Sequence, residues 1–364
     1  MVELADIFVR HGPEYRARFE DRMPGNHLKV MRAVERCRTE ALGGRVFECH
    51  ECGEKRYSYH SCRNRHCPKC QNPESSDWLE RLSRLLLPVP YFLCTFTFPG
   101  ELRHLARKKQ KILYDILFRA SAEALKSLAL DPRHLGGDIG FMGVLHTWTR
   151  DLAYHPHVHY VVPGGGLSPE GERWLPTRNP KFLVPEKPLS IMFRAKVRDA
   201  LKREKLLSDI PASAWTKDWI VNIERVGTGE TALKYLAPYI FRVAISNRRI
   251  ESLENGRVTF SFKDRDSGEL KRRTLDAEEF IRRFLQHVLP DRFVKVRYYG
   301  FLGQRSRDKL EKARTLLHVE PEDPAVPRIP AIDIVSKTAD KMSCPKCGGQ
   351  MHLLRIIEPK WSPT

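Results

Sequence analysis

Three histidines alternate along one short stretch of the chain, His155-Pro-His157-Val-His159. Alternate residues of an extended chain project from one face, so two of these imidazoles can bind the same ion. Pro156 has no N–H to donate to a sheet, so a strand that begins at residue 157 favours His157 and His159 as ligands and leaves His155 at the edge. The pair predicts a divalent metal site.

A third imidazole, His146, lies in the preceding β-rich run, Gly143 to Trp148. A short polar connection separates the two runs, which predicts an antiparallel hairpin with His146 opposite one of the pair and on the same face. Three imidazoles leave coordination positions open for phosphate oxygens and water, as a catalytic metal requires. The alternative is that these histidines only form hydrogen bonds on a half-buried sheet, but three on neighbouring strands favour the metal.

Two tyrosines four residues apart, Tyr235 and Tyr239, are candidate nucleophiles for phosphoryl transfer. The pKa of a phenol is ordinarily near 10, so attack on a phosphate needs a Lewis-acidic metal and nearby cations such as Lys234 and Arg242. On a helix the two positions share a face, which is also the pattern of a packed core. Pro238 lies between them and kinks or restarts such a helix.

Nine cysteines, an odd number grouped largely in CxxC pairs, indicate metal ligation rather than disulfides. Cys49-His-Glu-Cys52 and Cys67-Pro-Lys-Cys70 together supply four thiolates, the set that a tetrahedral structural Zn²⁺ takes. Four thiolates leave no position for water, so the predicted zinc stabilises a small segment and performs no catalysis. Four nearby side chains form a second site or share the first: Cys37, His60, Cys62 and His66.

A third CxxC pair lies near the C-terminus, at Cys344 and Cys347, and supplies only half a site. His352 adds a third candidate ligand and no fourth is evident, so we predict no independent zinc there. Cations are interleaved with the N-terminal ligands and predict contacts with DNA phosphates: Arg63, Arg65 and Lys69.

The charge of the whole chain indicates a polyanionic partner. Lys and Arg outnumber Asp and Glu by 63 to 45, which gives a formal net charge of +18 over 364 residues. Nucleic acid is the leading candidate for such a partner. The sequence contains no apolar run of about 20 residues, so we expect an intracellular protein without a membrane span.

The elements that must position these residues predict an α+β fold with an antiparallel sheet. β-Branched and aromatic residues from Tyr91 to Phe98 predict a buried strand that Pro99-Gly100 ends. Tyr298 and Tyr299 are competing nucleophile candidates, but their β-like run favours a structural role. We expect helices at 27–38, 78–87, 101–130, 191–206, from 231 and at 277–288, and strands at 143–148, 157–162, 219–224, 258–262, 270–274 and 294–299.

Changes in composition predict four parts of the chain. Residues 1–75 form a zinc- and DNA-binding domain, and residues 76–250 carry the histidines and tyrosines. Residues 251–318 extend the catalytic region with α/β structure. Residues 319–364 form a Pro-rich tail that is loose apart from its CxxC knuckle.

Together these motifs resemble the rolling-circle HUH transposases of the insertion-sequence-91 type. The resemblance covers most of the chain and rests on three stretches in order: Cys49 with Ser61-Cys-Arg-Asn-Arg-His-Cys-Pro-Lys-Cys-Gln71, His155-Pro-His-Val-His-Tyr-Val-Val-Pro-Gly-Gly-Gly166, and Tyr235-Leu-Ala-Pro-Tyr239 running into Arg242-Val-Ala-Ile-Ser-Asn-Arg-Arg249. It implies a ferredoxin-like HUH endonuclease core, with flanking helices, behind the N-terminal zinc-binding domain. It also implies Mg²⁺ or Mn²⁺ on His157 and His159, with His146 in the third-ligand position.

The resemblance further implies that Tyr235 and Tyr239 are paired nucleophiles. One strand of the element is cut, attached through its 5′ phosphate, displaced by the host replication machinery and joined to a target. The expected partner is single-stranded DNA in the bacterial cytoplasm, at the nucleoid. Basic residues beside the tyrosines are expected to contact it: Lys234, Arg242, Arg248 and Arg249.

Two other interpretations remain at this point. A replication initiator or a conjugative relaxase would perform the same chemistry on an origin, although the zinc segment and the C-terminal layout favour a transposase. A zinc-finger regulator, from a different class, would bind DNA with a steep salt dependence and never become covalently attached to it.

Overall fold

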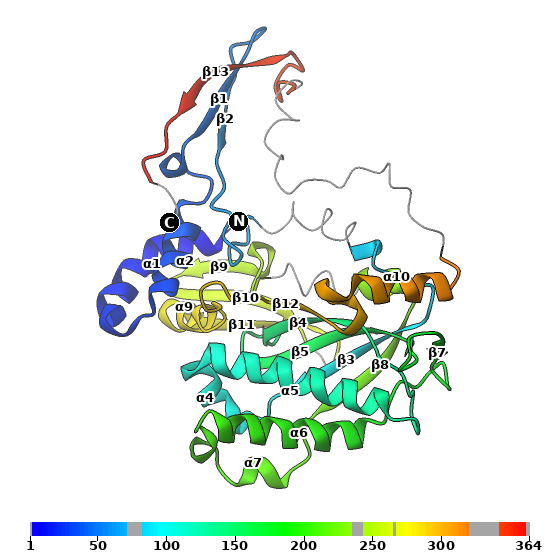
Figure 1. The fold of residues 1–364 in the computed structure, drawn as a ribbon. Helices are drawn as coiled ribbons and strands as arrows, with labels where there is room; N and C mark the ends of the chain where they lie inside the picture. Colours follow the sequence, from blue (N-terminus) through cyan, green and yellow to red (C-terminus); the bar gives the residue numbers. More distant parts are fainter. Residues whose placement is uncertain (1, 71–81, 235–242, 265–266, 320–341, 362–364) are drawn as a thin grey trace.

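A five-stranded antiparallel sheet carries the histidines, in a computed structural model that describes residues 2–70, 82–234, 243–264, 267–319 and 342–361. The strand order is β12-β4-β5-β3-β8 (Figure 1). The bounds are β3 Tyr91–Thr97, β4 Phe141–Trp148, β5 Tyr154–Pro163, β8 Val221–Gly227 and β12 Val296–Tyr299. The predicted α+β class with a ferredoxin-like core is confirmed.

Helices cover one face of this sheet. They are α4 (Arg103–Lys108), α5 (Gln110–Leu130), α6 (Glu186–Arg203) and α7 (Ser213–Thr216), with α5 and α6 lying side by side along the sheet (Figure 1). Val158 and Tyr160 of β5 point into this core, where the Tyr160 hydroxyl donates to the carbonyl of Phe118 at 3.1 Å. Because side chains alternate along a strand, His155, His157 and His159 face the opposite side of the sheet.

Gly143 makes room for Tyr160, its partner across the β4–β5 pair. A Cβ at position 143 would collide with the Tyr160 ring and lie 3.3 Å from the Phe118 ring. We expect Gly143→Ala to lower the free energy of unfolding by about 1–3 kcal/mol, since an overpacked core must shift rings that already fill it. Gly100→Ala is the matched control, because a Cβ there meets nothing within 4 Å. Urea denaturation measures both; equal stability of the two variants would contradict the expected overpacking.

The opposite face of the sheet is covered by other parts of the chain. A helical segment at residues 229–234 places Ala232 and Leu233 against Val144 and Val161. Farther along, α10 (Arg307–Leu316) packs on Phe301 and on the small sheet of β6 (Gly165–Leu167) and β7 (Trp174–Pro176). The histidines and this helical segment thus share one face.

A second core joins the N-terminal helices to the C-terminal half of the chain. It is formed by α1 (Leu4–Phe19), α2 (Gly25–Arg36), the sheet β9 (Ile250–Glu254), β10 (Arg257–Lys263) and β11 (Leu270–Asp276), and helix α9 (Ala277–Leu285). The rings of Phe8 and Phe284 meet edge to face at 5.5 Å. The prediction that residues 251–318 extend the catalytic region needs correction for residues 250–285, which pack on the N-terminal helices. The following strand, β12, belongs to the main sheet.

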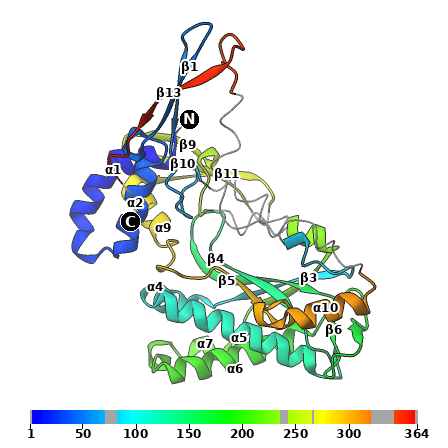
Figure 2. The same cartoon turned by 45° about the horizontal axis from the view of Figure 1, so that its top comes forward.

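The C-terminal residues complete a three-stranded ribbon of order β13-β1-β2, which projects away from α5 and α6 (Figure 2). Its strands are β1 (Gly44–Cys49), β2 (Lys55–Tyr59) and β13 (Met351–Ile357). The prediction of a tail that is loose apart from its CxxC knuckle is therefore wrong for residues 351–357, which form β13. No pattern within residues 351–357 predicts this strand, because it is an edge strand that pairs only with β1, about 300 residues away.

Short 3-10 turns connect these elements at 20–22, 40–42, 100–102, 207–209, 247–249, 300–302 and 304–306. Of the helix predicted at 78–87, residues 78–81 lie outside the described residues, and of the rest only Leu82 and Ser83 are helical. Among the helices that the structure describes, none has the length and apolar character needed to cross a membrane.

Candidate metal centres and active site

The hairpin of β4 and β5 brings three histidines together. His146 is opposite His157 in the strand register, and His159 follows on the same face of β5. One ring nitrogen from each of His146, His157 and His159 lies within 4.8 Å of the other two. The predicted hairpin and the predicted face of His146 are confirmed by this register.

Neighbouring groups orient two of the rings. His157 Nδ1 lies 2.6 Å from the carbonyl oxygen of His155, and since a carbonyl only accepts, Nδ1 carries the proton. The lone pair of His157 then belongs to Nε2. His159 Nδ1 lies 2.9 Å from the Thr95 hydroxyl on β3. Such outer contacts fix the tautomer and the direction of metal-binding imidazoles.

His155 is next to His157 on the same strand face, with ring centroids 5.2 Å apart, but it is not one of the three histidines whose ring nitrogens cluster. Its Nδ1 accepts a hydrogen bond from Nη2 of Arg103 on α4 at 2.8 Å. A guanidinium can only donate, so His155 Nδ1 carries no proton and its lone pair accepts this hydrogen bond. This geometry agrees with leaving His155 outside the predicted ligand set.

Two of the three histidines, His146 and His159, are held in their neutral form. His146 and His159 are 5% and 7% exposed. Burial lowers the pKa of His159 to about 4, and it lowers the pKa of His146 well below its ordinary value, with further lowering by the charges of His157 and Lys295. Neutral imidazole is the form that binds metal ions, so at neutral pH no proton has to be displaced from His146 or His159.

Lys295 is a functional candidate that the sequence analysis missed. Its Nζ lies 5.2 Å from the ring centroid of Trp148, and that ring lies 4.1 Å from the ring of His146. Arg65 approaches the same segment, with Nη1 donating to the Phe293 carbonyl at 2.7 Å. Burial lowers the pKa of Lys295 to about 7, and a phosphate beside it would favour its charged form. With Arg65 it makes the surroundings of His146 suitable for a phosphate. No local motif marks Lys295; only the pairing of β12 with β4 brings it there.

The predicted nucleophiles Tyr235 and Tyr239, and the neighbouring Arg242, lie outside the described residues. The chain reaches them from the histidine face, since Ala232 and Leu233 pack there and Lys234, which is exposed, is the last described residue before them. Ala232 and Leu233 belong to the same buried cluster as Val144 and Val161. Val144 is two positions from His146 on β4, and Val161 is two positions from His159 on β5. The described chain before the two tyrosines therefore ends on the sheet face that carries the three histidines.

The competing tyrosines are placed less favourably. Tyr299 is on the helix-covered face, stacked on Phe141 at 5.0 Å, and burial raises its pKa to about 12. Tyr298 pairs with Met142 on the histidine face. Four residues of strand separate Met142 from His146, a distance of about 13 Å. These positions do not favour Tyr298 or Tyr299 as the nucleophile.

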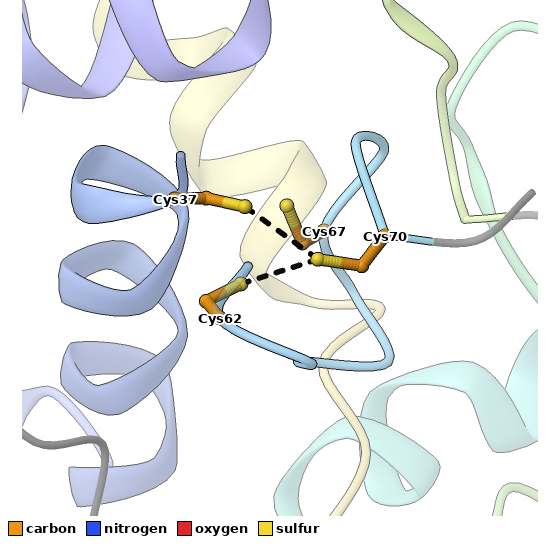
Figure 3. Close-up of side chains that lie close together, drawn as sticks. All are labelled: Cys37, Cys62, Cys67 and Cys70. Atoms are coloured by element: carbon orange, nitrogen blue, oxygen red, sulfur yellow. Dashed lines mark hydrogen bonds between the residues drawn. The ribbon is translucent and has the colours of Figure 1, made fainter. Parts of the chain in front are cut away.

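The first cysteine cluster joins the end of α2 to the loop after β2. Cys37, Cys62, Cys67 and Cys70 point toward one another (Figure 3), with all four sulfurs within 4.8 Å. Cys37 and Cys62 lie 3.5 and 3.6 Å from the sulfur of Cys70. His66 is not a member: its Nε2 accepts from the amide of Leu289 at 3.3 Å, and burial lowers its pKa to about 3.

The second cluster corrects the predicted grouping. Cys49 and Cys52 lie with Cys344 and Cys347, again with four sulfurs within 4.8 Å, and not with Cys67 and Cys70. The two N-terminal CxxC pairs therefore belong to different clusters. Proximity along the sequence suggested one site, but β13 brings the C-terminal pair to the end of β1. His352 is outside this cluster and packs its ring on His50 at 4.2 Å.

Some of the cations predicted to bind DNA have partners within the protein. Lys69 forms an ion pair with Glu3 at 2.6 Å, and Arg249 donates to the Ser261 carbonyl at 2.8 Å. Arg63 and Arg248 are exposed. Contact with DNA remains a prediction for all of them, and the geometry favours Arg63 and Arg248.

Comparisons with known proteins agree with both halves of this architecture. A family model described as "Transposase zinc-binding domain" matches residues 7–98, and one described as "Putative transposase" matches residues 140–309. The chain is 40% identical to "Putative transposase y4qJ" of Sinorhizobium fredii, across 99% of this chain and 97% of that protein. It is 28% identical to the "Transposase for insertion sequence element IS801" of Pseudomonas savastanoi pv. phaseolicola, across 74% of this chain and 68% of that protein. No solved structure matches the chain. With this coverage and these two domains in order, the chain belongs to the transposases of the insertion-sequence-91 type.

Proposed function

We propose that this transposase cuts and joins single-stranded transposon ends through a 5′-phosphotyrosine, in rolling-circle transposition. The observation that carries the proposal is the group of three histidines on the sheet face where Ala232 and Leu233, the described residues shortly before Tyr235, pack. Imidazoles in that arrangement suit a metal that binds phosphate, and a phenol nearby suits attack on it.

A divalent ion fits His146, His157 and His159. When bound, it polarises the scissile phosphate as a Lewis acid. Within the described residues no carboxylate joins the three imidazoles. Because Mg²⁺ prefers oxygen ligands and imidazole suits softer divalent ions, this donor set favours Mn²⁺ over Mg²⁺.

The chain's own residues perform the transfer. The phenol oxygen of Tyr235 or Tyr239 attacks the phosphorus, its proton is lost, and the bond to the 3′ oxygen of the upstream nucleotide breaks. The products are a 5′ phosphate ester on tyrosine and a free 3′-hydroxyl. The ester conserves the energy of the broken bond, so a 3′-hydroxyl can reverse the step and join a target. Lys295, Arg65 and Lys234 supply positive charge for the phosphates.

Single-stranded DNA is the proposed substrate, displaced by host replication at the bacterial nucleoid. The +18 charge supplies the attraction for such a strand.

The test is covalent capture on single strands that tile both ends of the element. With Mn²⁺, a strand labelled at its 3′ end should remain on the protein in denaturant, and a strand labelled at its 5′ end should be released as a shorter fragment. We expect the Tyr235→Phe/Tyr239→Phe double variant to form no adduct. Tyr298→Phe, on the same sheet face but about 13 Å away along the strands, is the matched control and should form it normally.

Three results would oppose the proposal. An adduct in the double variant would mean a different nucleophile, and an adduct on the 5′-labelled fragment would mean the opposite polarity. DNA binding with no adduct under any condition would favour the zinc-finger regulator.

A further inference from the structure

Eight of the nine cysteines lie in two clusters of four, and only Cys94 is left over. The cluster of Cys37, Cys62, Cys67 and Cys70 falls wholly within residues 7–98, the range of the zinc-binding domain. The other cluster does not, because half of its sulfurs come from the far end of the chain. The family match therefore accounts for one cluster only.

We propose that Cys49, Cys52, Cys344 and Cys347 bind a second structural zinc ion, which fastens the C-terminal strand β13 to the N-terminal ribbon. The sulfur geometry fits this ion. Sγ of Cys49 lies 3.4 Å from that of Cys347, and Sγ of Cys52 lies 3.6 Å from that of Cys344. Four sulfurs at 2.3 Å from one zinc ion in a tetrahedron would be about 3.8 Å apart.

Two matching turns present these sulfurs. In the first, the amide of Gly53 donates to the Cys49 carbonyl at 3.1 Å, and the amide of Cys49 donates to the Glu54 carbonyl at 2.9 Å. Gly53 has φ +67°, in the left-handed region that glycine adopts without strain.

The second turn has the same two hydrogen bonds at the same residue spacing. The amide of Gly348 donates to the Cys344 carbonyl at 2.9 Å, and the amide of Cys344 donates to the Gly349 carbonyl at 2.7 Å. Gly348 has φ +79°, and the amide of Lys346 points at Sγ of Cys344 at 3.4 Å. Each turn sets two sulfurs on one side of the backbone, so two facing turns supply a complete set of four ligands.

Strand pairing brings the turns together. Cys49 is the last residue of β1 and is paired with Met351, the first residue of β13. The turn after β1 and the turn before β13 therefore meet at the same end of the ribbon. Four thiolates fill the tetrahedron, so this ion has a structural and not a catalytic role.

Side-chain packing alone contributes little to holding β13 on the ribbon. Only Met351 of its seven residues is buried. Leu353, Leu354 and Ile356 are 48%, 43% and 61% exposed, and the buried cluster at the tip consists of Phe47, Cys49, Cys344 and Met351, two of them ligands. A segment without its own core is the kind that a metal ion stabilises.

The proposal is tested by counting zinc in the full-length protein. All samples carry His157→Ala, so that metal bound by the three histidines does not enter the count. We expect two zinc ions per chain in this parent, one in Cys344→Ser/Cys347→Ser, and two in the control Cys94→Ala. One zinc in the parent, or two in the Cys344→Ser/Cys347→Ser variant, would overturn the proposal. An intact mass that shows disulfides in place of zinc would also overturn it.

A conservative variant separates metal loss from misfolding. Because zinc accepts three cysteines and one histidine, Cys347→His should keep the second ion while Cys347→Ser loses it. Hydrogen exchange should then show faster exchange of the β13 amides in Cys347→Ser, with the α1 amides unchanged. Unchanged β13 exchange after loss of the ion would show that the ion does not fasten the strand.

Discussion

Replacing His157 with alanine should lower the rate of DNA cleavage by about 10³-fold, whereas replacing His155 with alanine should change it by less than about threefold. The first change removes one of the three imidazoles that lie within 4.8 Å of one another. Loss of a metal ligand removes several kcal/mol of transition-state stabilisation, and about 4 kcal/mol corresponds to this factor.

His155→Ala is a demanding control because the two residues share a strand and a face. The ring of His155 lies 5.2 Å from the ring of His157, but its Nδ1 is bound to Arg103 and it is not one of the three whose ring nitrogens cluster. Its carbonyl, which accepts the proton of His157 Nδ1, is backbone and survives the substitution. Single-turnover cleavage with saturating Mn²⁺ measures both variants. Equal losses in the two would mean that the histidines only support the sheet, and a His157→Ala enzyme as fast as the parent would remove the histidines from the reaction.

The histidine site could be predicted from sequence because its information is local. Alternation sets the face of His157 and His159, and a short connection sets the register that brings His146 to them. The surroundings of the site could not be predicted in the same way. Lys295 reaches His146 because β12 adds to the edge of β4 after a connection of about 150 residues, and no pattern within either strand encodes that pairing.

The cysteines show the same limit more sharply. CxxC spacing correctly marks pairs of cysteines that enter the same cluster, since two sulfurs on one tight turn are a local property. Which pairs combine is a tertiary property. Cys49 and Cys347 are 298 residues apart, and the nearer pair at Cys67 and Cys70 is instead completed by Cys37 and Cys62. The three CxxC pairs and the single cysteines Cys37 and Cys62 can be divided into clusters in several ways, and proximity along the chain selected a wrong one.

Removing the first cysteine cluster should have the largest effect on stability. We expect Cys62→Ser/Cys67→Ser to lower the free energy of unfolding by about 4 kcal/mol or more. Structural zinc contributes roughly 10–16 kcal/mol in isolated zinc fingers, and we expect a smaller loss here because the core shared by α1, α2 and α9 remains. Urea denaturation followed by tryptophan fluorescence measures the change. The matched comparison is Cys344→Ser/Cys347→Ser, which should cost less, because it frees a strand that is mostly exposed.

Loss of the first cysteine cluster should also affect the histidine face of the sheet. Between two of the ligands, Arg65 donates to the Phe293 carbonyl and His66 accepts from the Leu289 amide, so the knuckle holds the segment that leads into β12. That segment carries Lys295, whose charge acts on His146. Hydrogen exchange should therefore increase at residues 289–296 when the first cluster is dissolved and stay unchanged when the second is. Equal protection of this segment in both variants would mean that the zinc-binding domain folds beside the histidine site without positioning it.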